Sequence, residues 1–395
     1  MFSLRPVRRF CVTTTAAAAT SMSSQISKPK TLDEPALVKI KAERDPNKLF
    51  HLFKANAHNR LVIENRFAFE DTVSLLAGAN RFDYIENLLE HQKILPQGRR
   101  EGFIVRIIML YGKVGMTEHA LQTFYTMHLF GCTRTVKSFN AALKVLAQTL
   151  DLGAIQVFLD EVPRRFGISP DVFSLNIIIK AFCQMGIVDS AYLIMVEMEK
   201  VGIRPDVVTY TTLISAFYKN GRSEIANGLW NLMVHKGCLP NSATFNVRIQ
   251  YLVNRRRAWK ANSLVAKMQL LRINPDDVTF NLVIKGFYLS GYPEMARRVY
   301  SALCDKGYKP NRMIYQTLIH YDCAAEEFNL AFRMCKDSME KKWFPSVDTI
   351  CKLLEGLQKK AEFTKARIIM MLVQRRKPPY SADVLGVFQS IISEG

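Results

Sequence analysis

The chain has 395 residues, of which 49% are apolar and 23% are charged; 54 basic residues against 35 acidic ones give a formal charge of +19. This composition is typical of a folded protein and argues against a wholly disordered chain. No segment reaches the roughly 18 to 20 consecutive apolar residues of a membrane-spanning helix, so we expect no membrane insertion. The positive charge favours a polyanionic partner without identifying it.

The first thirty residues differ in composition from the rest of the chain. Residues 1–30 contain no Asp or Glu, five basic residues and a run of Thr, Ser and Ala. This composition is typical of an organelle transit peptide, and a merely disordered N-terminus is the alternative. The early positions of Arg5, Arg8 and Arg9 favour the mitochondrial matrix over the chloroplast. Removal of this segment would leave a formal charge of +14.

The remainder of the chain follows a period of 35 residues. The prolines that keep this spacing are Pro170, Pro205, Pro240, Pro275, Pro310 and Pro345. Alanines keep it too, at Ala191, Ala226, Ala261, Ala296, Ala331 and Ala366. A period between about 20 and 50 residues predicts a repeat protein, in which each unit packs on its neighbours along one elongated array.

Each repeat is predicted to contain two helices. In the repeat 207–241, apolar residues recur at helical spacing twice, at Tyr210, Leu213, Ile214 and Phe217 and then at Ile225, Leu229, Leu232 and Met233. Gly221 is expected to end the first helix, because glycine readily adopts the left-handed conformation found there. Gly237 ends the second helix, and Pro240 fixes the link to the next repeat. The repeating alanine falls where the two helices would cross closely.

The period also predicts the organisation of the chain. We expect a transit peptide at 1–30, degenerate N-terminal repeats at 31–100, eight repeats at 101–381 and a C-terminal cap at 382–395. The repeats within 101–381 are 101–135, 136–171, 172–206, 207–241, 242–276, 277–311, 312–346 and 347–381. The fold class is therefore all-α, a stack of helix-turn-helix units.

These repeats resemble a known family. The segments VVTYTTLISAFYKNGRSEIANGLWNLMVHKGCLPN and DVTFNLVIKGFYLSGYPEMARRVYSALCDKGYKPN look like pentatricopeptide repeats of the pure 35-residue type. The resemblance implies a right-handed superhelical solenoid that binds single-stranded RNA, about one base per repeat. The alternative is the tetratricopeptide repeat, whose period is 34 residues and whose usual ligand is a peptide.

The resemblance also implies which residues read bases, namely the fifth and the last residue of each repeat. Carried onto this chain, the pairs are Asn140/Asp171, Asn176/Asp206, Thr211/Asn241, Asn246/Asp276 and Asn281/Asn311. By the family's usual correspondence, Asn/Asp prefers U, Thr/Asn prefers A and Asn/Asn accepts C or U. The five repeats would then read 5′-U-U-A-U-Y-3′. The pairs Val105/Thr135, Gln316/Ser346, Cys351/Ser381 and Glu70/Arg100 match no base preference.

Elementary chemistry supports this assignment and also offers an ordinary explanation. An Asn side chain presents a donor and an acceptor to a base edge, and a nearby Asp can orient its amide. However, Asn near a helix start is often only a cap, and Asp after Pro is a common loop residue. Phe173, Val208, Val278 and Met313, each second in its repeat, would contact bases, or they simply pack in the fold.

Three lysines follow the asparagines at a spacing of four residues. They are Lys144, Lys180 and Lys285. Residues four apart share a helix face, so we expect these ammonium groups beside the base-reading residues, where they would meet phosphates. A solvated lysine on a polar face is the alternative.

A narrower resemblance concerns the biological role. RTVKSFNAAL, FNVRIQYL and SMEKKWFPS look like segments of a short subgroup associated with plant mitochondrial ribosomes. The expected partners are thus single-stranded RNA, either a mitochondrial transcript or ribosomal RNA, and mitochondrial ribosomal proteins. Five readable bases address a transcript poorly, which also favours a role assisted by partners.

Nothing in the sequence predicts an enzyme, a metal site or a cofactor. The chain lacks H-E-x-x-H, a Walker glycine loop and any zinc-ligand spacing, so we expect no catalytic residue. None of the eight cysteines forms a C-x-x-C pair, and they are expected to be small buried side chains in a reducing compartment.

Overall fold

The computed structural model describes residues 35–305 and 307–393, and the regular structure within these ranges is entirely helical. This confirms the all-α prediction. The predicted transit peptide at 1–30 lies outside the described residues. The chain divides into two compact parts, which we call the N-terminal part (up to Leu213) and the C-terminal part (from Ile214), with the boundary inside α12 (Val207–Lys219).

The N-terminal part begins with short helices and continues with helix pairs. The short helices are α1 (Pro35–Ala42), α2 (Pro46–Ala55) and α3 (Arg60–Glu64). The pairs are α4 (Arg66–Gly78) with α5 (Phe82–Ile94), α6 (Glu101–Lys113) with α7 (Thr117–Thr126), α8 (Val136–Gln148) with α9 (Leu152–Phe166), and α10 (Val172–Gln184) with α11 (Val188–Lys200). Single 3-10 turns, η1 (Pro96–Arg99) and η2 (Met127–Phe130), follow α5 and α7.

The segment before residue 66 departs from the two-helix pattern of a repeat because its caps lie close together. The side chains of Asp45, Asn59 and Asn65 each accept a hydrogen bond from a backbone N–H at a helix start. An N-cap fixes where a helix begins, so these three caps allow only the lengths of 10 and 5 residues seen in α2 and α3.

The C-terminal part consists of helix pairs throughout. After α12 come α13 (Ser223–His235), α14 (Ser242–Asn254), α15 (Ala258–Leu270), α16 (Asp277–Leu289), α17 (Pro293–Asp305), α18 (Arg312–Ala324), α19 (Phe328–Glu340), α20 (Val347–Lys359), α21 (Phe363–Gln374) and α22 (Ala382–Ser393). The final helix, α22, packs on α20 and α21.

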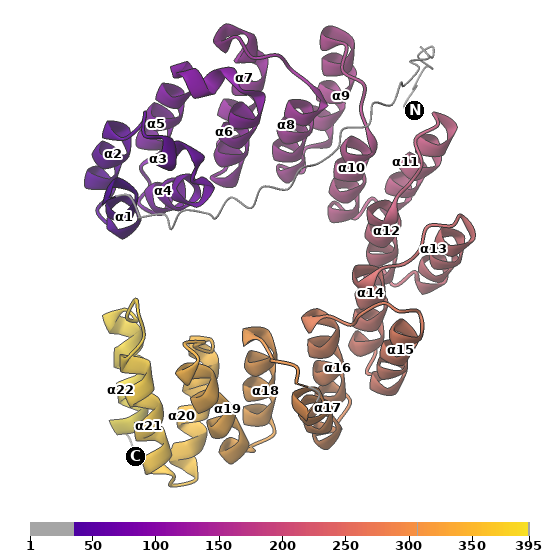
Figure 1. The fold of residues 1–395 in the computed structure, drawn as a ribbon. Coiled ribbons are helices and arrows are strands. Elements are labelled where there is room, and N and C mark those ends of the chain that lie inside the picture. The colour runs from indigo at the N-terminus through magenta and orange to yellow at the C-terminus, as the bar shows by residue number, and fades with distance from the viewer. Residues whose placement is uncertain (1–34, 306, 394–395) are drawn as a thin grey trace, which may run out of the picture. The chain divides into compact units, whose positions relative to one another are not determined.

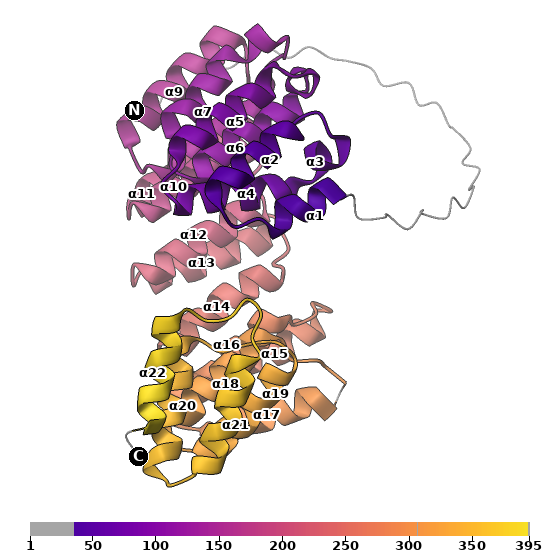
Figure 2. The same ribbon diagram turned by 90° about the vertical axis from the view of Figure 1, so that its left-hand side faces the viewer.

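Within each part the repeats stack on one another through their first helices. In the N-terminal part α6 contacts α8 and α8 contacts α10, while α6 and α10 also contact their own second helices (Figure 1). In the C-terminal part α14, α16, α18 and α20 contact one another in that order, and each also packs on the helix that follows it (Figures 1 and 2). This confirms the predicted stack of helix-turn-helix units. The repeating alanines of the second helices are fully buried, as the sequence predicts.

The turn between the two helices of a repeat keeps one backbone conformation whether or not glycine is present. Gly186 and Gly221 have φ angles of 80° and 76° there. Arg256, Glu326 and Ala361 occupy the same register in other repeats, with φ angles of 53°, 59° and 57°. A side chain in this left-handed region costs roughly 1 kcal/mol or more, so the packing of the two helices determines the turn in these repeats.

Candidate nucleic-acid interface

Three of the predicted residue pairs are joined by a hydrogen bond. The Asn140 Nδ2 donates to Asp171 Oδ1 over 3.0 Å. Asn176 donates to Asp206 over 3.1 Å, and Asn246 donates to Asp276 over 3.0 Å. The fifth and the last residue of these repeats therefore meet, although 30 or 31 residues separate them in sequence.

The last residue lies there because it caps the first helix of the next repeat. In α10, the Asp171 carboxylate accepts the backbone N–H of Ser174 over 2.9 Å, and Ser174 Oγ accepts the backbone N–H of Asp171 over 3.1 Å. This reciprocal arrangement is a capping box, which satisfies two donors at the helix start. Asp206 with Thr209 and Asp276 with Thr279 repeat it. Each of these aspartates therefore caps a helix and holds the asparagine amide at the same time.

The same hydroxyl holds the other side of the asparagine amide. Ser174 Oγ lies 2.6 Å from Asn140 Oδ1, and Thr209 and Thr279 lie 2.6 Å from the Oδ1 atoms of Asn176 and Asn246. Each amide therefore gives one N–H to a carboxylate and accepts one hydroxyl proton. Because an Asn amide has two N–H donors and two lone pairs, one donor and one acceptor remain for a ligand.

These contacts lower the pKa values of two of the capping carboxylates, Asp171 and Asp276. Burial acts to raise the pKa of Asp276, but the backbone N–H of Thr279, the Asn246 amide and the Thr279 hydroxyl together lower that pKa below its ordinary value. The pKa of Asp171 is lowered in the same way against the effect of burial, by Ser174 and Asn140. Near neutral pH the sites of Asn140 and Asn246 therefore present a carboxylate beside the amide.

The other two predicted pairs differ, since Thr211 carries a hydroxyl in place of an amide and Asn311 stands in place of an aspartate. Thr211 is half-buried in α12, and Asn241 caps α14 by accepting the Thr244 N–H over 3.0 Å. Within the described residues, no hydrogen bond joins Asn281 to Asn311. The Asn281 Oδ1 atom is buried without a hydrogen-bond partner in that part of the chain, and the Asn311 amide donates to Asp277 Oδ2 over 2.5 Å.

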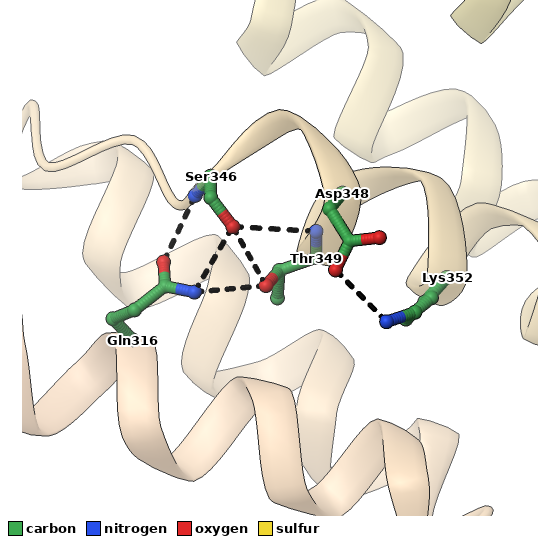
Figure 3. A network of polar contacts seen from close by, with 5 residues as sticks. All are labelled: Gln316, Ser346, Asp348, Thr349 and Lys352. Carbon is green, nitrogen blue, oxygen red and sulfur yellow. Dashed lines mark hydrogen bonds and ion pairs between the residues drawn. The ribbon is translucent and has the colours of Figure 1, made fainter.

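A similar network forms in the repeat 312–346, where the sequence predicts no base preference. Gln316 Oε1 accepts the Ser346 backbone N–H over 2.9 Å, and its Nε2 donates to Ser346 Oγ over 3.1 Å and to Thr349 Oγ1 over 2.8 Å (Figure 3). An open hollow of about 560 Å³ adjoins this amide, lined by Asn311, Arg312, Met313, Gln316 and Ser346. A hydroxyl three residues into the next helix was the sequence signal for this network.

Apolar side chains and lysines surround these amides. Phe173, Val208, Val278 and Met313 are exposed by 65%, 55%, 43% and 40% of their surface, so part of each side chain packs in the fold and part is open to a ligand. In the repeat 347–381 the second residue is Asp348, which pairs with Lys352 over 2.9 Å (Figure 3). Lys144 and Lys180 are exposed and Lys285 is half-buried, and none of the three forms an ion pair with another described residue.

The described residues contain no group of three or more His, Cys, Asp or Glu that would hold a metal ion. In the same ranges, no helix is long and apolar enough to cross a membrane. Cys132, Cys323 and Cys335 are buried, and burial raises the pKa of Cys323 to about 12. Cys304 is exposed, contrary to the expectation of buried cysteines, because it faces outward near the end of α17.

Models of one repeat family match several segments of the chain. The model described as "PPR repeat family" matches residues 170–219 and 205–254, and the model described as "PPR repeat" matches residues 106–132 and 278–308. These segments of the chain are pentatricopeptide repeats. The tetratricopeptide alternative is thereby set aside.

Several proteins of Arabidopsis thaliana are similar to this pentatricopeptide-repeat protein. The mitochondrial pentatricopeptide repeat-containing protein At1g80150 is 64% identical over 205 residues, which cover 51% of this chain and 52% of that protein. The small ribosomal subunit protein mS79 is 37% identical over 199 residues, covering 50% and 48%. The small ribosomal subunit protein mS78 is 33% identical over 199 residues, covering 50% and 49%. The chain thus spans about half the length of the curated relatives it matches.

Among solved structures, the crystal structure of the pentatricopeptide repeat protein PPR10 from maize matches 90% of this chain and 59% of that one. The sequence identity is 18% and the TM-score is 0.46.

Proposed function

We propose that this pentatricopeptide-repeat protein binds single-stranded RNA in mitochondria, one base per repeat, and acts in organellar RNA processing, stability or translation. The observation that carries the proposal is the recurring amide. In three repeats an asparagine is held by a carboxylate on one side and a hydroxyl on the other. Each leaves one donor and one acceptor, which is what the edge of an unpaired base requires.

The surroundings of the amides suit the same ligand. The exposed ring of Phe173 offers a flat face on which a base can stack, and exposed aliphatic side chains such as Val278 offer an apolar contact. Lys144, Lys180 and Lys285 lie one helical turn from the amides and supply positive charge for the phosphates. Read from the resemblance, the successive pairs select 5′-U-U-A-U-Y-3′, and Gln316 adds an amide at a sixth position, whose base is not assigned.

The proposal is tested by binding of the full chain to short RNAs. We expect a strand containing UUAUC to bind more tightly than a strand with the same bases in shuffled order, and more tightly than the UUAUC strand in a duplex. Fluorescence anisotropy at several salt concentrations measures both comparisons and reports the phosphate contribution separately. Equal affinity for the ordered strand, the shuffled strand and the duplex would contradict base reading.

A second role is favoured by the relatives. The names of mS79 and mS78 identify them as small ribosomal subunit proteins, and we propose as the alternative that this chain is a component or associated factor of the plant mitochondrial ribosome. In that case it would contact ribosomal RNA and ribosomal proteins. Sedimentation of mitochondrial lysate with and without magnesium chelation distinguishes the two roles. A component moves with the ribosomal particles and shifts with them when the subunits separate, whereas a transcript-binding protein does not.

A further inference from the structure

The repeat 277–311 differs from its neighbours at one position of the helix that follows it. In the other repeats between residues 136 and 381, the third residue is Ser138, Ser174, Thr209, Thr244, Thr279 or Thr349, and each of these is buried. After the repeat 277–311, the residue at this position is Ile314, which is also fully buried. Because Ile314 has no hydroxyl, Asn281 Oδ1 lacks the donor that Asn140, Asn176 and Asn246 have.

The carboxylate side is missing as well. Asn311 stands where Asp276 stands in the preceding repeat, and its side chain is committed elsewhere. Its Oδ1 accepts the backbone N–H groups of Met313 and Ile314 over 3.0 and 3.1 Å, and its Nδ2 donates to Asp277. Asn281 is 9% exposed, like Asn176 and Asn246, so it is equally enclosed but held by neither bond.

This difference decides which way the amide faces. Rotating the Asn246 amide by 180° would break its bond to the Thr279 hydroxyl and turn its oxygen toward the Asp276 carboxylate, which is repulsive. Rotating the Asn281 amide breaks no such hydrogen bond, because neither a hydroxyl nor a carboxylate of the described residues holds it. U and C present opposite patterns, because U offers an acceptor at O4 and a donor at N3 while C offers a donor at N4 and an acceptor at N3. An amide that rotates freely matches both bases, and a fixed amide matches one.

We propose that the third residue of the following repeat is a positioning residue for base selection. Its hydroxyl fixes the orientation of the asparagine amide, and Ile314 leaves Asn281 able to accept both C and U. The inference rests on the proposed function and adds to the two residues per repeat a third that touches no base. A hydroxyl at position 314 would give Asn281 the orientation seen in the Asn/Asp repeats and therefore a preference for U.

The experiment compares two substitutions of the same shape. Ile314→Thr adds the hydroxyl, and Ile314→Val removes the same bulk without adding it. The full chain and both variants are titrated with strands containing UUAUC and UUAUU. We expect the wild type and Ile314→Val to bind the two strands within about twofold, and Ile314→Thr to prefer UUAUU by about fivefold or more, as one hydrogen bond allows. Equal ratios for the Thr and Val variants would overturn the inference.

A measurement without RNA separates the inference from the proposed function. In thermal unfolding we expect Ile314→Thr to melt at a higher temperature than Ile314→Val, and this advantage to disappear when Asn281 is replaced by Leu. Loss of the advantage only in the Asn281→Leu background supports the contact, whereas an advantage that persists there overturns it. If the contact forms but the ratio of C to U binding is unchanged, the positioning role is wrong while base reading at the other four positions stands. A wild type that discriminates at none of the five positions contradicts the proposed function itself.

The reverse change provides a second test should the Ile314 variants fold poorly. Thr279→Val removes the hydroxyl from Asn246 while keeping the side-chain shape. We expect the preference for U over C at the fourth base to fall about two- to threefold, less than a full loss because Asp276 still holds Nδ2. An unchanged preference in this variant would also overturn the inference.

Discussion

The repeats 242–276 and 277–311 are neighbours in the C-terminal part. Both have asparagine at the fifth position, but the two side chains differ in their hydrogen bonds. Asn246 is bonded to Asp276 and Thr279, whereas Asn281 has a buried oxygen without a partner among the described residues. Both asparagines are equally buried. The comparison shows that the hydrogen bonds of the asparagine amide depend on the residues at the start of the next helix, since the asparagine itself is the same in both repeats.

The largest expected effect comes from removing the bonded amides. We expect the double variant Asn176→Ala and Asn246→Ala to bind the UUAUC strand about 30- to 100-fold more weakly, because each base contact of this kind is worth roughly 1–3 kcal/mol. Fluorescence anisotropy measures the loss. Asn231→Ala, at an exposed position of the second helix α13, is the matched control and should bind like the wild type. Equal affinity of the double variant and the wild type would rule out these asparagines as base-reading residues.

The stability of the two repeats should differ without any ligand. We expect Asn246→Leu to lower the free energy of unfolding by about 1–3 kcal/mol, because it leaves the Asp276 carboxylate and the Thr279 hydroxyl with unmet hydrogen bonds. Asn281→Leu should cost less than about 0.5 kcal/mol or stabilise the chain, since its Oδ1 atom has no partner to lose. Urea unfolding of the two variants provides the comparison. Similar costs for both would show that the two amides are not in different states.

The lysines allow a test of the phosphate contribution in the same two repeats. Lys285 lies four residues after Asn281, while the corresponding residue after Asn246 is Gln250, which donates to Asn254 over 2.7 Å. We expect Lys180→Gln or Lys285→Gln to weaken binding of all RNAs by a few-fold and to reduce the salt dependence by about one phosphate contact. Gln250→Lys should have the opposite effect.

A control for this test is Lys267→Gln, because Lys267 is exposed on the second helix α15. It should leave both affinity and salt dependence close to those of the wild type. If Lys285→Gln changed the preference among bases rather than the overall affinity, the assignment to phosphates would be wrong.

The last expected effect is a dependence of the free energy of unfolding on pH, which we expect from the repeat 242–276 and not from 277–311. The pKa of Asp276 is lower in the folded chain than its ordinary value, so its ionised form stabilises the fold above the unfolded pKa of about 3.9. That contribution is lost as the pH falls through the lower, folded pKa. We expect the wild type to be more stable than Asp276→Asn at pH 7, by about 1 kcal/mol, and this difference to shrink below about pH 4. Unfolding measured across this range checks it, and a difference that is constant with pH would contradict the role of the carboxylate.

Much of the fold follows directly from the sequence. The spacing of the prolines and alanines predicts where the repeats begin, and α6, α8, α10, α12, α14, α16, α18 and α20 each begin at the first residue of a predicted repeat. The turns at Arg256, Glu326 and Ala361 are not predictable from glycine, because helix packing imposes their left-handed conformation. The short helices before residue 66 also differ from a repeat, since three closely spaced caps determine them.

The candidate site is only partly predictable. The pairing of Asn140, Asn176 and Asn246 with an aspartate follows from the resemblance, and the structure places those side chains within hydrogen-bond distance. The pairing of Asn281 with Asn311 does not form, because Asp277 competes for the Asn311 amide. The network of Gln316 is missed because it uses a backbone N–H and two hydroxyls in place of a carboxylate.

The last residue of a repeat caps the next helix, and this role limits which residues can be placed there to change the RNA sequence that such a protein would bind. Under the proposed function, changing the base that a repeat selects would mean replacing a residue that also starts the next helix, at a cost of roughly 0.5–2 kcal/mol when the new residue cannot cap. The residues suited to this position are therefore those that cap a helix with a side chain, namely Asp, Asn, Ser and Thr, whatever bases a target requires. The same restriction applies to natural sequence change and to design. A replacement made in one repeat destabilises the first helix of the repeat that follows.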